Sequence, residues 1–223
     1  MKLRVVIAFA IWSQALPAVA YAGSRFRTKP GAALVLGSLV SVLANAVGFI
    51  LSARLHNNQI VSYISSPLTA ALWFAALAEW QLTPRERTWL RRLIIAFLVV
   101  WIILVTWVED VSGFDVVTAP FYSFSIMSAA VWTLLRRATA ELHAPFYTAD
   151  WFWVCVALAI NGAVTGLAAP IGGYLYAKGE IDTFRLVWDL RAGFVTLSMV
   201  LLSWGVYVGP GVSKFFTIGT TEA

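Results

Sequence analysis

Long apolar stretches separated by short polar connections run along the whole chain. A helix needs about 20 mainly apolar residues to cross the hydrocarbon core of a bilayer. Seven stretches meet this requirement, at about residues 5–23, 32–54, 61–81, 91–108, 117–135, 150–172 and 184–208. Short connections favour antiparallel packing of neighbouring helices. The pattern therefore predicts an all-α integral membrane protein, a single bundle of seven transmembrane helices in which residues 1–223 form one domain.

Composition supports this prediction and excludes other classes of protein. Of the 223 residues, 60% are hydrophobic and 12% are charged, whereas soluble domains have roughly 45–50% and 25%. The net charge of +5 comes from short basic connections, and no nucleic-acid-binding motif accompanies it. The lipid bilayer is thus the predicted partner, and nucleic acid is excluded. The only cysteine, Cys155, lies in the sixth stretch, which excludes an internal disulfide.

The distribution of charge between the connections predicts the orientation of the bundle. The first, third and fifth connections hold nine basic residues, which are Arg25, Arg27, Lys29, Arg85, Arg87, Arg91, Arg92, Arg136 and Arg137. The fourth connection is acidic, with Glu109, Asp110 and Asp115. Because cytoplasmic connections are enriched in Lys and Arg, the N-terminus is expected outside and the C-terminus inside.

The first apolar stretch has a competing interpretation. The sequence "MKLR", the apolar run and "AYAGS" together are typical of a secretory signal peptide cleaved after Ala22. Cleavage would leave Gly23 outside and place every basic connection on the wrong side of the membrane. Lys2 and Arg4 argue against a retained helix, because the expected orientation requires these two charged side chains to cross the membrane. We interpret the stretch as a retained helix, and whether it is ever cleaved stays open.

Polar residues recur inside the spans. They include Ser38, Ser41, Asn45 and Ser52 in the second stretch, Ser62, Ser65, Ser66 and Thr69 in the third, and Ser123, Ser125, Ser128, Asn161 and Thr165 in the fifth and sixth. Such residues can bond neighbouring helices across their interface. They can also line a polar cavity that accepts a small ligand, among the second, third, fifth and sixth helices. Both interpretations place these side chains inward, so both stay open.

The seventh stretch carries three charges near its start, Arg185, Asp189 and Arg191. Arg185 and Asp189 are four residues apart, so a structural ion pair is predicted between them. Arg191 lies about 9 Å deeper than Arg185 along the helix axis. The alternative is a charged patch facing a cavity open to the outside, where Arg191 meets an anionic or zwitterionic ligand. The candidate ligand-binding residues are Asn45, Asn161, Thr165, Asp189 and Arg191.

Glycine and proline predict how some helices pack and where they break. Gly162 and Gly166 form a G-x-x-x-G pair, which is typical of close helix packing within a bundle or between copies in a homo-oligomer. Pro17 and Pro67 are expected to interrupt the first and third helices. Pro170, followed by two glycines, is expected to end the sixth.

No catalytic, metal or cofactor site is predicted. The seventh stretch has no lysine for a retinal Schiff base, and His56 and His143 fall at opposite ends of the bundle, which excludes a haem held between them. The sequence has no H-E-x-x-H, G-x-S-x-G or P-loop pattern. The carboxylates available for acid–base chemistry are Glu79, expected near Arg85 and Arg87, and Asp189, and they lie toward opposite membrane faces. An enzyme is therefore less favoured than a binding protein.

Four segments carry a resemblance to known proteins. They are "NNQIVSYISSPLTAALWF", "GFDVVTAPFYSFSIMSAAVWTLL", "DWFWVCVALAINGAVTGL" and "LVWDLRAGFVTLSMVLLSWGVY". With them the chain resembles a class of small, uncharacterised bacterial seven-helix inner-membrane proteins, and it is similar in layout to the seven-helix sensory modules of some bacterial histidine kinases. The resemblance implies a fold and an inner-membrane location, but no residue roles. Only "GVSKFFTIGTTEA" follows Pro210, so a sensor of this kind would signal through a partner protein.

The sequence thus leaves two main hypotheses for function. One is a non-enzymatic, receptor-like bundle or accessory subunit that binds a small molecule, a lipid or a membrane-protein partner. The other is a small transporter or permease that uses a polar cavity near Asp189 and Arg191.

Overall fold

The computed structural model describes residues 5–55, 59–109, 115–141 and 145–209. These residues form helices joined by short connections, without a strand among them. The helices are α1 (Val5–Ser13), α2 (Leu16–Gly23), α3 (Lys29–Leu55), α4 (Gln59–Glu79), α5 (Pro84–Ile103), α6 (Thr118–Ala140), α7 (Asp150–Ala177) and α8 (Ile181–Val208), with a π-helical turn η1 (Leu104–Val108) and a 3-10 turn η2 (Phe146–Thr148). His56, His143 and the segment after residue 209 lie outside the described residues.

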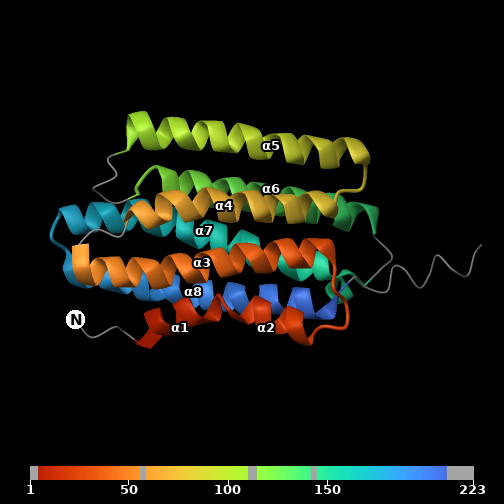
Figure 1. Ribbon diagram of the computed structural model, residues 1–223, viewed down its shortest axis with the longest axis horizontal. Coiled ribbons are helices and arrows are strands. Elements are labelled where there is room, and N and C mark those ends of the chain that lie inside the picture. Colours follow the sequence, from red (N-terminus) through yellow and green to blue (C-terminus); the bar gives the residue numbers. More distant parts are fainter. Residues whose placement is uncertain (1–4, 56–58, 110–114, 142–144, 210–223) are drawn as a thin grey trace, which may run out of the picture.

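The prediction of seven membrane-length helices is confirmed for the described part of the chain. Seven segments are long and apolar enough to cross a membrane, and α1 and α2 together form the first of them. The helices run side by side, with α5 at one edge of the bundle and α1 and α2 at the opposite edge (Figure 1). The most extensive contacts join α7 to α8 and α6, followed by those between α3 and α4, whereas α5 packs chiefly against α4.

The fourth span begins earlier than predicted from the sequence. Thr83 caps α5, because its hydroxyl accepts a hydrogen bond from the Glu86 amide and the Glu86 carboxylate accepts one from the Thr83 amide, each at 3.2 Å. Pro84 then occupies the first turn, where its missing N–H costs nothing. The predicted start at residue 91 is wrong because the charged residues before it belong to the helix, and T-P-R-E is a capping-box sequence.

Proline affects the three helices that contain it in different ways. The first span is interrupted between Ser13 and Leu16, next to Pro17, as expected. Pro67 lies inside a continuous α4, so the expected interruption there is absent. The predicted end of the sixth span near Pro170 was also wrong, since α7 continues to Ala177. Neighbouring helices can compensate for the hydrogen bond that a proline removes, so proline alone does not end a membrane helix.

Glycines let α7 approach its neighbours closely. A Cβ atom at Gly162 would lie 2.5 Å from the Ser123 carbonyl oxygen and 2.8 Å from the Met127 Cβ, and one at Gly166 would lie 3.0 Å from the Phe124 ring. The G-x-x-x-G pair therefore packs against α6 of the same chain, which is one of the two arrangements expected for it.

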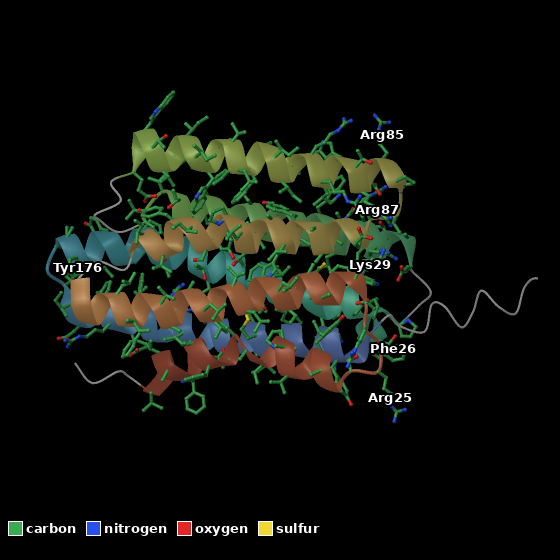
Figure 2. All side chains as sticks on the ribbon, viewed as in Figure 1. Arg25, Phe26, Lys29, Arg85, Arg87 and Tyr176 are labelled. Carbon is green, nitrogen blue, oxygen red and sulfur yellow. The ribbon has the colours of Figure 1, made fainter. Side chains whose placement is uncertain are left out.

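Most of the charged residues at one end of the bundle are arginines and lysines. Arg25, Lys29, Arg85 and Arg87 lie at this end, and Tyr176 lies at the other (Figure 2). We call it the basic end; α5 begins there, and α4 and α6 end there. Glu79 was expected near Arg85 and Arg87. Its carboxylate lies 4.0 Å from Arg87 Nη1, and its closer partner is Arg91 Nη2 at 2.5 Å.

The α6–α7 packing predicts a large effect of a single methyl group at position 162. Gly162→Ala should lower the free energy of unfolding by about 1–3 kcal/mol, the usual cost of overpacking a filled site. Thermal unfolding of the detergent-solubilised protein measures the change. Gly193→Ala is the matched control, because a Cβ atom there meets nothing within 4 Å. Equal unfolding temperatures for the two variants would contradict the close α6–α7 contact.

Candidate ligand cavity

A cavity of about 410 Å³ lies among α1, α3, α4, α6, α7 and α8. It occupies the half of the bundle in which α4, α6 and α8 begin, away from the basic end. Its polar lining residues are Gln14, Ser38, Ser41, Asn45, Ser62, Ser65, Ser66, Thr69, Asn161, Thr165 and Arg191. The volume is within the range of about 300–1,000 Å³ that is usual for small-molecule sites.

The spacing of small residues explains why space remains between α3 and α4. On α4, Ser62, Ser65, Ser66 and Thr69 recur every three or four residues, which places them on one helix face. The polar residues of α3 follow a similar spacing from Ser38 to Asn45. Short side chains on both facing surfaces leave a volume that Leu or Phe would fill.

The interruption of the first span contributes a polar group to the cavity wall. Gln14 lies between α1 and α2, where its side-chain carbonyl accepts a hydrogen bond of 2.8 Å from Asn45 Nδ2. The same Asn45 amide donates to the Ser41 carbonyl at 2.9 Å. A polar link therefore joins the interrupted span to α3 at the cavity.

Arg191 is the only cationic side chain among the described residues that line this cavity. It is partly buried on α8, and its guanidinium lies 5.4 Å from the centre of the Trp188 ring in a cation–π contact. It makes no hydrogen bond or ion pair with another residue of the described segments. An arginine stays protonated in proteins, and a charge at membrane depth is costly and usually functional.

Two acidic or polar groups lie close enough to Arg191 to interact with its charge, Asp115 and Tyr122. Asp115 precedes α6 and is outside the span. Burial is the main reason why the pKa of the Asp115 carboxyl is raised to about 6, and the neighbouring Glu109 acts in the same direction, whereas a hydrogen bond with its own backbone and the charge of Arg191 act in the opposite direction. Asp115 is therefore ionised at pH 7 and becomes neutral in mildly acidic solution.

Other polar groups around the cavity can also donate hydrogen bonds to a ligand. The Ser38 hydroxyl and the Trp73 indole N–H are buried and have no hydrogen-bond partner among the described residues. The Asn161 amide and the Thr165 hydroxyl face the same space from α7. A guanidinium together with indole, amide and hydroxyl donors suits a carboxylate or phosphate group.

Four of the five predicted ligand-binding residues meet at this cavity. Asn45, Asn161, Thr165 and Arg191 line it, whereas Asp189 does not. On α8 the lining positions follow the helical repeat from Trp188 through Arg191 to Val195 and Met199. Asp189 is two residues from Arg191, about 200° around the helix, so the two side chains cannot face the same space.

The predicted ion pair between Arg185 and Asp189 is replaced by a different one. Arg185 Nη1 lies 3.3 Å from Asp182 Oδ1, three residues earlier on the same helix. Both side chains are exposed, so the pair contributes little to stability.

Several residues that line the cavity are not predicted from the sequence, including Gln14, Trp73 and Tyr122. A glutamine within an apolar run beside Pro17 was an available signal. The two aromatic residues gave none, because aromatic residues occur on lipid-facing and inward-facing surfaces alike.

The described segments contain no group of three or more His, Cys, Asp or Glu residues that could hold a metal ion. Comparisons of the chain with protein-family models, with curated proteins and with solved structures found no match. The case for a function therefore rests on the cavity.

Proposed function

We propose that this protein is a non-enzymatic integral membrane protein that binds one small anionic or zwitterionic molecule in the cavity around Arg191. The observation that carries the proposal is a partly buried guanidinium that lines a polar cavity and has no carboxylate in hydrogen-bonding reach within the described segments. A bound carboxylate or phosphate would offset the cost of that charge. The protein, alone or as a homo-oligomer, would then act as a sensor or as an accessory subunit of a membrane complex.

The lining residues would have separate roles. Arg191 would bind the anionic group, and Trp188 would hold the guanidinium in place through their cation–π contact. Asn161 and Thr165 would donate hydrogen bonds from α7, and the link between Asn45 and Gln14 would close the opposite wall.

The first span would be a retained part of this site. Ile7, Ala10, Ile11 and Gln14 line the cavity, so cleavage after Ala22 would remove one wall.

We also propose that the basic end faces the cytoplasm of a bacterium, with the protein in the inner membrane, the N-terminus outside and the C-terminus inside. The gathering of basic residues from the connections near Arg25 and Arg85 at one end supports this orientation (Figure 2). The cavity then faces outward.

The orientation predicts which positions react with a membrane-impermeant maleimide in intact cells. Lys178→Cys, at the end of α7 opposite the basic end, should be labelled, and Arg25→Cys should be labelled only after the cells are made permeable. Both native side chains are exposed, and Cys155 is buried and should give no background. The reverse pattern would overturn the orientation.

Ligand binding predicts that the protein retains a small anionic compound when it is gently extracted from its native membrane. Native mass spectrometry and an absorption spectrum of the same sample identify that compound. Arg191→Gln should lower its occupancy at least about tenfold, because a hydrogen-bonded charge contact is worth roughly 1.5–3 kcal/mol.

Arg185→Gln is the matched control for that experiment. It removes the same charge from the same helix, at a residue paired with Asp182 outside the cavity, so occupancy should not change. Equal retention in the Arg191 and Arg185 variants would refute Arg191 as the anchor. A retained second protein in place of a small compound would instead identify an accessory subunit.

The pKa of Asp115 predicts that an anionic ligand binds more tightly as the pH falls from 8 to 5. Protonation at about pH 6 removes the negative charge beside Arg191, so repulsion of a bound anion decreases. The dissociation constant of a carboxylate that stays ionised in this range should fall by up to about tenfold, which corresponds to about one pKa unit of coupling. Isothermal titration calorimetry measures it. Asp115→Asn should bind tightly at both pH values, and a variant that keeps the full pH dependence would exclude Asp115 as its source.

The second candidate function is a permease, and the interrupted first span favours it. Transporters often bind their substrates where a membrane helix is interrupted, and Gln14 lies at such an interruption on the cavity wall. Proteoliposomes that take up the retained compound would favour the permease, and binding without uptake would favour the receptor.

A further inference from the structure

We propose that a separate site between α5 and α6 binds an anionic phospholipid, with an acyl chain in an apolar groove and the headgroup beside Arg85 and Arg92. The site lies at the edge of the bundle away from the cavity around Arg191, and it does not depend on the function proposed for that cavity.

The groove has a volume of about 690 Å³ and is lined almost entirely by apolar side chains. Leu93 and Phe97 face it from α5, Phe121 and Phe124 from α6, and Phe74 forms its floor from α4. It exists because α5 packs chiefly against α4 and stands at the edge of the bundle (Figure 1). A groove with this lining suits a hydrocarbon chain.

The groove continues into a basic pocket where α5 begins. Arg85, Trp89 and Arg92 line that pocket from α5, and Trp132 lines it from α6. Trp89 and Trp132 also line the groove, so the charged and apolar parts form one surface. The three residues of α5 are spaced by four and three positions, which places them on one helix face over about 10 Å.

The ion pairs of the basic end distinguish these two arginines from their neighbours. Arg87 and Arg91 face Glu79, Arg136 pairs with Glu86, and Arg137 pairs with Glu141. Arg85 and Arg92 have no ion pair or hydrogen bond with any residue of the described segments. Glu86 also lines the pocket, but its negative charge is already matched by Arg136.

The charged and apolar parts of the site together favour an anionic phospholipid as its ligand. A molecule with a negative polar end and a hydrocarbon tail matches both parts of the surface, and an anionic phospholipid supplies both. Tryptophan side chains favour the level of lipid headgroups, and basic pockets between membrane helices bind anionic headgroups. Trp89 and Trp132 line the same pocket as the two arginines, and about half of each residue is exposed.

The test is native mass spectrometry of the purified full chain, titrated with phosphatidylglycerol and, separately, with phosphatidylcholine of the same acyl chains. The wild-type protein should bind phosphatidylglycerol at least about tenfold more tightly, since each cation near an anionic headgroup contributes favourably. The double variant Arg85→Gln/Arg92→Gln should lose that preference.

Two further variants keep the test decisive. Arg25→Gln/Arg27→Gln removes the same charge from exposed side chains at the same end of the bundle, and it should keep the preference. Ala96→Trp fills the groove with an indole at a lining position and should weaken both lipids, with both arginines intact. Equal affinity of the wild type for the two lipids, or equal loss in the two double variants, would overturn the site. So would a co-purified protein that occupies this site and that phosphatidylglycerol does not displace.

Discussion

The arrangement of this protein depends on close packing of α7 against α6 and α8. In a bilayer, lipid and protein interior are equally apolar, so helices associate largely through close van der Waals contact. Gly162 and Gly166 bring α6 to within contact of the α7 backbone, and Gly172 leaves room for the Trp188 ring of α8. Gly205 of α8 likewise lets α7 approach closely, because a Cβ atom at Gly205 would lie 3.0 Å from the Asp150 carbonyl oxygen.

This packing also determines the geometry of the cavity. Asn161 precedes Gly162, so the contact with α6 fixes where its amide points along the wall. The Trp188 ring packs on Gly172 and makes the cation–π contact with the guanidinium of Arg191. The same contacts that hold three helices together therefore set the positions of a polar group and a charge that line one space.

Two kinds of space remain inside or beside the bundle, and they differ because of the side chains that surround them. Between α3 and α4 the facing residues are serine, threonine and asparagine, so the space is polar. Between α5 and α6 they are phenylalanine, leucine and alanine, so the space is apolar. Arg191 lines the first space, and Arg85 and Arg92 line the pocket beside the second; none of the three has an ion pair with a carboxylate among the described residues.

The sequence by itself determined the seven apolar helices, because a span needs a continuous run of about 20 apolar residues and the short connections contain no such run. It also indicated most of the polar residues that meet at the cavity, since serine and asparagine inside a span must face protein or water. Helix ends were less certain: Pro84 begins a helix in a charged segment and Pro170 does not end one. Only the tertiary structure decided which partners the charges have and which faces meet. Arg185 pairs with Asp182 rather than Asp189, and Arg191 turns toward the cavity while Asp189 does not. The rotation of a helix about its axis is set by contacts with its neighbours, such as Trp188 on Gly172, and those contacts join residues far apart in the sequence.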